Sequence, residues 1–248
     1  MAFSKYAQYY DVLNRGKDYF SEAKYLAKLL HKKKITGRRI LEFGAGTGKH
    51  AEILKKIGFD VIGIEKSRRM ISVAKSRGRR EIFQGDIRTK RLRGLYDGVV
   101  SLFHVMSYQC HDVDVASVFR NASHHLKSGG LFVFDFWYKP AVLNLRPEVR
   151  EKTIRTSQME ISRRAFPKIR AKANIVDVHY HVKICELFSG KNQRFEELHS
   201  MRYFTIQEFA PFAKKAGFSR VVSEEFGTSR PPGRNTWSVC SVYRKGSS

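Results

Sequence analysis

A glycine-rich turn between a short apolar strand and a helix constrains the fold of this chain more than any other feature. The apolar run 40–43 leads into Gly44, Gly46 and Gly48, after which a helical pattern begins. Glycine adopts positive φ and lets a ligand approach the backbone, and the free N–H groups of a helix N-terminus suit an anionic group such as a carboxylate. Lys49 stands where the dinucleotide fingerprint has its third glycine, which argues against a pyrophosphate cradle.

Strand and helix patterns alternate through the first 140 residues. Apolar strands are predicted over 39–43, 60–64, 81–83, 98–103 and 131–136. Amphipathic helices are predicted over 21–34, 48–57, 67–76 and 116–127. Strands separated by helices of this length predict a doubly wound α/β fold with a mostly parallel sheet.

The pattern changes after residue 145, where no long helical period is found. Short segments at 158–163, 175–187 and 193–203 predict antiparallel strands, and the chain then returns to a helix at 205–216 and closing strands at 218–223 and 237–243. We therefore expect residues 146–203 to form an antiparallel β insertion. The core is expected to comprise residues 1–145 and 204–248, with residues 1–36 as an N-terminal helical lid.

An acidic residue marks the end of each of the first three predicted strands. Glu42 precedes the glycine turn by two residues, and a carboxylate there can hold an ammonium group. Glu65 lies 19 positions after Gly46 and can accept hydrogen bonds from both hydroxyls of a ribose. Asp86 follows the third strand and can accept from an adenine amino group. These three residues are expected at the edge where open α/β sheets bind ligands.

In this order and spacing, the glycine turn and the three acidic residues resemble the class I S-adenosylmethionine-dependent methyltransferases. Further segments resemble one subgroup, the N-methyltransferases and N,N-dimethyltransferases of nucleotide-linked amino sugars. Those segments are Tyr9-Tyr10-Asp11, residues 16–22, 103–108, 134–140, 178–180 and 199–205. The resemblance implies a seven-stranded sheet of order 3-2-1-4-5-7-6, an antiparallel insertion that caps the active site, and a homodimer.

The resemblance also assigns donor-side roles to residues of this chain. Tyr19 should contact the methionine carboxylate, Lys66 and Met70 should flank the adenine, and Phe103 should lie along the donor. The full set expected to bind the cofactor, S-adenosyl-L-methionine, is Tyr19, Glu42, Gly44, Ala45, Gly46, Glu65, Lys66, Met70, Asp86, Ile87 and Phe103.

The acceptor side is expected to use residues from the lid, the later strand ends and the insertion. These candidates are Tyr10, His104, Tyr108, Trp137, Tyr138, His179 and Arg202. Tyr108 or His179 is the candidate catalytic residue that orients or deprotonates the acceptor, and Arg202 is the candidate partner of a substrate phosphate.

Several of these residues have an ordinary structural interpretation as well. Trp137 and Tyr138 suit a place in the core beneath the insertion, and Arg202 suits a surface ion pair. His179, Tyr180 and His181 alternate along one strand, so the sequence leaves open which side chain faces the cleft.

The charge of the chain is strongly positive. Lys and Arg number 47 against 23 Asp and Glu, a net charge of +24 with a pI near 10.1. Such a surplus favours phosphate-bearing partners, or else a basic but inert surface. Residues 66–93 hold eleven of the cations, which we interpret mostly as solvated faces because no interleaved aromatics or known nucleic-acid module is evident.

The location and metal content follow from what the sequence contains. Three widely spaced cysteines argue against a disulfide framework and a CxxC zinc site, so no metal is expected and a cytoplasmic location fits best. No apolar stretch approaches the roughly 18 residues that span a bilayer, and the first residues do not resemble a signal peptide.

Methyl transfer from a sulfonium donor needs alignment more than acid–base chemistry. Orientation supplies roughly 7–11 kcal/mol of the barrier, whereas a general base adds about 10²–10⁴-fold. We therefore predict an S-adenosylmethionine-dependent methyltransferase that acts on a small-molecule amine, most simply that of a nucleotide-linked amino sugar. The alternatives are an O-methyltransferase, an RNA methyltransferase suggested by the charge, and a non-catalytic nucleotide-binding module.

Overall fold

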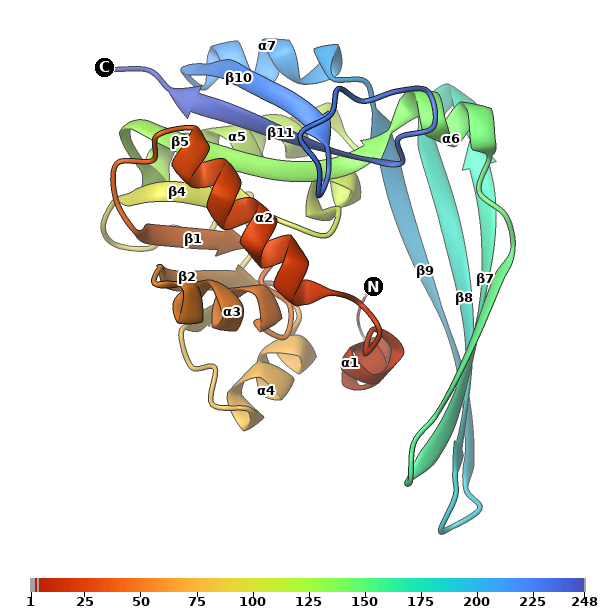
Figure 1. The fold of residues 1–248 in the computed structure, drawn as a ribbon. Coiled ribbons are helices and arrows are strands. Elements are labelled where there is room, and N and C mark those ends of the chain that lie inside the picture. Colours follow the sequence, from red (N-terminus) through yellow and green to blue (C-terminus); the bar gives the residue numbers. More distant parts are fainter. Residues whose placement is uncertain (1–2, 4, 248) are drawn as a thin grey trace.

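The computed structural model describes residue 3 and residues 5–247. Its core is a sheet of seven strands in the order β3-β2-β1-β4-β5-β11-β10 (Figure 1). The first five strands are parallel, and β11 and β10 are antiparallel to their neighbours. The strands are β1 (Arg39–Phe43), β2 (Asp60–Glu65), β3 (Ile82–Gln84), β4 (Tyr96–Ser101), β5 (Leu126–Tyr138), β10 (Phe218–Glu225) and β11 (Ser238–Lys245). In chain order the core strands follow the predicted 3-2-1-4-5-7-6 pattern, so the expected methyltransferase-like α/β fold is confirmed.

Helices cover both faces of the core sheet. The helices are α2 (Tyr19–Lys32), α3 (Lys49–Ile57), α4 (Arg68–Ser76), α5 (Asp112–His125) and α7 (Ala210–Lys215). Side chains of α2 and α3 pack on one face, and those of α5 and α7 pack on the other. Alternate residues of β1 serve the two layers, Ile40 on the first face and Leu41 on the second.

The insertion forms a second, antiparallel sheet that we call the cap. Its strands are β6 (Arg150–Arg155), β7 (Met159–Arg170), β8 (Ile175–Glu186) and β9 (Asn192–Phe204). The cap projects from one end of the core, and the short helix α1 (Tyr10–Leu13) lies between the two (Figure 1). The cap joins the core sheet where β9 pairs with the end of β5, through Trp137–Tyr203 and Tyr138–Phe204.

Several elements differ from the sequence prediction. The strand β6 and the helix α6 (Lys139–Leu145) were not predicted, although Pro140 in the first turn of α6 is a typical helix start. The predicted helix 205–216 is divided into a 3-10 turn at Gln207–Phe209 and a short α7, which has Pro211 in its first turn. Strand β5 begins at Leu126 rather than residue 131, with a register shift in its pairing to β4.

Candidate active site

The glycine turn after β1 has one crowded side and one open side. Gly44 has φ +72°, and a Cβ there would lie 2.6 Å from Cγ2 of Val105. Gly46 has φ +55°, and a Cβ there would meet no atom within 4 Å. Only glycine is free of strain in this backbone conformation. The turn is therefore packed tightly against the protein at Gly44 and left accessible at Gly46, as close approach of a ligand requires.

Glu42 is a buried carboxyl group with unused bonding capacity. Its side chain is 2% exposed, and Oε1 lies 3.8 Å from Nδ1 of His50. Oε2 is buried without a hydrogen-bond partner among the described residues. Burial, with a smaller effect from the nearby Glu65 carboxyl, raises the pKa of Glu42 to about 8. A cationic ligand beside Oε2 would both satisfy this atom and favour its ionised form.

Glu65 is held rigidly by backbone amides at the end of β2. Oε2 accepts a hydrogen bond from the N–H of Gly46 at 2.9 Å, and Oε1 accepts one from the N–H of Ser67 at 2.7 Å. Burial raises the pKa of Glu65, although these bonds oppose the rise. Because each carboxylate oxygen can accept a second hydrogen bond, both remain able to bind a ligand hydroxyl.

Asp86 lies beyond β3, at the same carboxyl edge as the other two acids. Its carboxylate accepts hydrogen bonds from the side chain and backbone of Arg88, and Oδ2 lies 3.0 Å from Nζ of Lys66. The guanidinium of Arg88 holds the pKa of Asp86 well below its usual range. Asp86 is therefore ionised and paired with protein cations at the predicted position.

The N-terminal lid is fastened to the glycine turn by Asp11. Oδ1 of Asp11 accepts a hydrogen bond from Oγ1 of Thr47 at 2.8 Å and lies 3.6 Å from Nζ of Lys49. Oδ2 pairs with Arg77 of α4's C-terminal cap. Asp11 is itself buried, so the lid contributes a fixed wall to the donor side of the site.

Tyr19 brings a second unused polar atom to the donor side. Its hydroxyl is buried and has no hydrogen-bond partner of normal geometry within the described part of the chain, although the Tyr10 phenol lies beside it. Its ring packs at 5.0 Å against that of His50, whose Nε2 lies 2.8 Å from Oε2 of Glu22. Burial raises the pKa of Tyr19, so the hydroxyl stays protonated and can donate.

Phe103 and His104 form a strained corner after β4. Both residues have φ +63°, which is uncommon outside glycine. The corner is held by Asp135 of β5, whose Oδ1 accepts from the His104 N–H at 2.9 Å and whose Oδ2 lies 2.8 Å from Nδ1 of His104. Burial opposes ionisation of Asp135, but the contacts with His104 prevail and its pKa is lowered. Nζ of Lys17 lies 3.9 Å from the centre of the Phe103 ring, which shows that this ring face binds a cation.

A buried tyrosine–histidine–glutamate relay lies where the cap meets the core. The hydroxyl of Tyr108 is 2.8 Å from Nδ1 of His199 on β9, and Nε2 of His199 is 3.4 Å from Oε2 of Glu197. Oε1 of Glu197 accepts a hydrogen bond from the N–H of Tyr6 at 2.8 Å. Burial raises the pKa of Tyr108 well above its usual value, so this phenol is neutral. The geometry suits the passage of a proton from Tyr108 to His199.

Comparison with known proteins identifies the family to which this chain belongs. A family model described as a methyltransferase domain matches residues 16–224. The chain belongs to this methyltransferase family. The predicted class is thereby confirmed, and the protein is a methyltransferase enzyme.

Individual relatives of this methyltransferase are similar over nearly their whole length. The dTDP-3-amino-3,4,6-trideoxy-alpha-D-glucopyranose N,N-dimethyltransferase of Streptomyces venezuelae is 29% identical over 228 residues, 90% of this chain and 94% of that protein. A solved S-adenosylmethionine-dependent methyltransferase from Clostridium acetobutylicum matches with a TM-score of 0.81 at 17% identity, covering 100% of both chains. An amino pentose methyltransferase from Micromonospora echinaspora, solved with SAM bound, matches with a TM-score of 0.75 at 22% identity, over 99% and 98% of the two chains. At these identities the two solved structures establish the fold.

The methyltransferase structure gathers most predicted site residues around two neighbouring regions. Ala45 and Met70 are buried, Ile87 joins the core cluster behind β1, and Lys66 stays exposed beside Asp86. On the acceptor side, Tyr10 lies edge-on to Phe103 at 6.3 Å, and Trp137 lies 6.2 Å from the ring of His104. The donor and acceptor candidates therefore meet at Phe103 and His104.

Three acceptor-side candidates point elsewhere. We call the face of the cap that packs against the N-terminal lid its inner face, and the opposite one its outer face. His179 is exposed on the outer face, opposite Phe166 and Leu198 in the strand register. Arg202 also lies on the outer face, with Nη1 2.7 Å from Oδ1 of Asp112. Tyr138 packs against the main core cluster. In these orientations the three side chains do not face the other acceptor-side candidates, and their contacts with the acceptor stay predictions.

Sequence reasoning missed four residues that the structure brings into the site. These are Asp11, Asp135, Glu197 and His199. Asp11, Asp135 and His199 lie inside segments that carried the family resemblance, so a signal was present. The strand spacing did not reveal that His199, rather than His179, shares the inner face with Val178.

The described residues contain neither a candidate metal-binding group of three His, Cys, Asp or Glu side chains nor a helix long and apolar enough to cross a membrane.

Proposed function

We propose that this methyltransferase uses S-adenosyl-L-methionine to methylate the amine of a nucleotide-linked amino sugar. The proposal rests on two buried atoms, Oε2 of Glu42 and the hydroxyl oxygen of Tyr19, that have no hydrogen-bond partner among the described residues. One is an acceptor and the other a donor, which suits the ammonium and carboxylate groups of a methionine moiety. The nucleotide-sugar acceptor is supported by the relative from Streptomyces venezuelae.

The residues present fit this cofactor along its whole length. Glu42 and Tyr19 would hold the amino-acid end, and Glu65 would accept from the ribose hydroxyls. Asp86 lies at the expected adenine end. When bound, the cofactor supplies a methyl group on a positively charged sulfur. The Phe103 face suits such a cation once the Lys17 ammonium, which lies on it in this structure, has moved away.

The relay centred on His199 would manage the proton of the acceptor amine. Tyr108 accepts a hydrogen bond from the amine N–H through its hydroxyl oxygen, while its own proton faces Nδ1 of His199. Glu197 stabilises the positive charge that His199 gains when it takes this proton. His104, held by Asp135, lies between the donor edge and the acceptor and would orient the amine. Tyr108 keeps its predicted catalytic role in this proposal, and His199 replaces His179.

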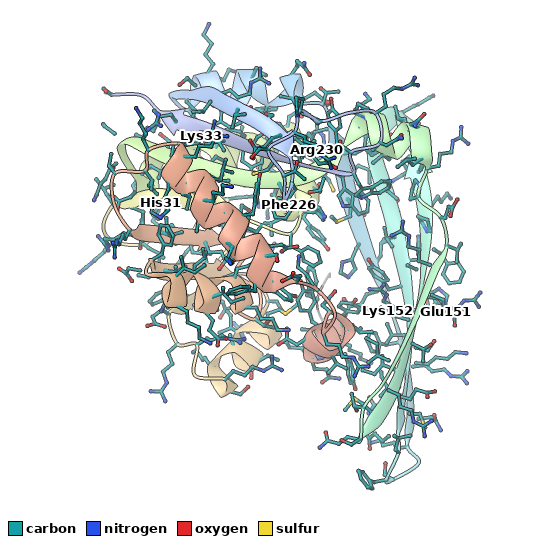
Figure 2. The ribbon with its side chains drawn as sticks, viewed as in Figure 1. His31, Lys33, Glu151, Lys152, Phe226 and Arg230 are labelled. Carbon is teal, nitrogen blue, oxygen red and sulfur yellow. The ribbon has the colours of Figure 1, made fainter. Side chains whose placement is uncertain are left out.

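Two cations on the inner face of the cap suit the phosphates of the acceptor. Arg163 of β7 and Lys152 of β6 are directly opposite in the strand register, and Figure 2 shows Lys152 and Glu151 on β6. Nε of Arg163 is buried without a partner among the described residues, and Nη1 donates to the Tyr6 hydroxyl at 2.9 Å. Like charges opposite each other destabilise a sheet. A phosphate bound between them would offset that cost, so we assign to Arg163 the role predicted for Arg202.

A substrate panel tests this function. Purified protein and radiolabelled S-adenosylmethionine would be incubated with dTDP-amino sugars, the matching hydroxy sugars, and RNA. We expect label only in the amino sugars. Transfer to hydroxy sugars alone would establish the O-methyltransferase alternative, and transfer to RNA would overturn the small-molecule assignment. A homodimer and a cytoplasmic location remain predictions, which light scattering and cell fractionation test.

A further inference from the structure

The cations of residues 66–93 divide into two groups. The first group is engaged within the protein. Lys66 pairs with Asp86, Arg77 with Asp11, and Arg79 with Glu52. Arg88 pairs with both Asp86 and Asp114, and Arg91 donates a hydrogen bond to Asn121. The second group forms no ion pair with any described residue and consists of Arg68, Arg69, Lys75, Arg80, Lys90 and Arg93. Three of its members, Arg68, Lys75 and Arg80, are exposed and lie close together. The second group is therefore available to an external anion.

These three cations converge on one hollow beside the edge of the core sheet. Arg68, Ser72 and Lys75 share one face of α4, because they are spaced at i, i+4 and i+7. Arg80, Phe83 and Gln84 come from the loop before β3 and from β3 itself. Together with Ile71 and Ile82, these residues line a hollow with a volume of about 420 Å³. None of the lining residues belongs to the donor or acceptor site.

An exposed aromatic ring completes the hollow. Phe83 is 46% exposed and has no ring or cation contact with another described residue. β3 is the terminal strand of the core sheet and pairs only with β2, so its outer backbone edge is free among the described strands. A solvent-exposed aromatic face beside unpaired cations is the arrangement on which single-stranded nucleic acids stack their bases.

We propose that this hollow binds a nucleoside phosphate unit, with its phosphates at Arg68, Lys75 and Arg80 and its base stacked on Phe83. Three cations match two or three phosphate charges, and one phenylalanine matches one base. The unit would come from a single-stranded RNA or from a free nucleotide. This site is separate from the proposed methyl-transfer site and does not depend on its identity.

Fluorescence anisotropy with a fluorescein-labelled 12-nucleotide oligouridylate tests the proposal. We expect F83A to weaken binding roughly tenfold through loss of base stacking. R68Q/K75Q/R80Q should weaken it further and make the slope of log K against log salt shallower by about 2, since each phosphate contact adds about 0.7 for a single strand. K24Q/K28Q/K32Q on α2 removes the same charge elsewhere and should leave binding within about twofold.

The outcomes separate the sources of the ligand. If UTP displaces the oligouridylate at a concentration similar to that of the oligomer's uridylate residues, the hollow is assigned to free nucleotides. If UTP does not displace it, the hollow is assigned to a single strand. Equal weakening by the α2 variant, equal competition by polyglutamate, or wild-type binding by F83A and the triple variant would overturn the proposal. Circular dichroism melts and unchanged S-adenosylmethionine binding by each variant show that the fold and the donor site are intact.

Discussion

The donor edge and the cap build their sites in different ways. Gly46, Glu65 and Asp86 lie within a few residues of core strand ends, and backbone amides or neighbouring cations hold the two acids. His199 and Arg163 lie in the middle of long antiparallel strands, where the register alone decides which side chains face inward. A shift of one residue in that register would move every side chain to the other face. The donor edge is therefore determined locally, and the acceptor side by pairing across the whole cap.

The largest expected effect distinguishes two histidines of the cap, one on each face. We expect H199A to lower kcat about 10²-fold or more, because the proton acceptor next to Tyr108 is lost. H179A should leave kcat unchanged, because that side chain is exposed on the outer face. Initial rates with the dTDP-amino sugar measure both effects, and calorimetry with S-adenosylmethionine should give similar affinities for the two variants. A greater loss in H179A than in H199A would mean that the register inferred for the cap is wrong.

On the donor edge, E65Q should weaken S-adenosylmethionine binding about 10- to 100-fold. The amide keeps one acceptor but loses the charge that strengthens hydrogen bonds from the ribose hydroxyls. Isothermal calorimetry measures the affinity. E52Q on α3 is the matched control, since the described partners of Glu52 are Lys56 and Arg79. If E65Q and E52Q bound S-adenosylmethionine with equal affinity, Glu65 would not be the residue that binds the ribose.

Two arginines on opposite faces of the cap provide a second test. R163Q should raise KM for the nucleotide sugar roughly tenfold, with little change in kcat, because a charge-assisted contact to phosphate is lost. R202Q should leave KM unchanged, since Arg202 pairs with Asp112 on the outer face. A rise in KM for R202Q alone would return the phosphate to the position expected from the sequence.

A pH dependence of stability is expected from Glu42. Its pKa in the folded protein is about 8, above the usual carboxyl value, so between those values the folded chain retains a proton that the unfolded chain releases. The free energy of unfolding must therefore fall as pH rises through this window. Tm should drop more from pH 6 to pH 8 in the wild type than in E42Q, by thermal melts without ligand. Parallel curves for the two proteins would show that Glu42 is already ionised.

The same contrast explains what the sequence could predict. The core order, the glycine turn and the acids at strand ends follow from periodicity and from motifs a few residues long. The face of β8 and β9 that points inward depends on where α1 and the 3-10 turn at Tyr6–Tyr9 pack, which no local pattern encodes. Asp135 was missed as a site residue because its function is to hold the His104 corner, a contact between two strand ends. The spacing of residues along the sequence does not predict long-range partners of this kind.

The narrow joint between the two sheets has an evolutionary consequence. Among the described residues, two pairs at the end of β5 and the end of β9 connect the cap to the core by strand pairing. A cap of different sequence can therefore be exchanged together with the lid and core residues that contact it, while the machinery for the methyl donor is inherited intact. Chimaeras cut at Tyr138 and Phe204 that retain Glu197 and His199 offer a direct route to new acceptor preferences on an unchanged donor site.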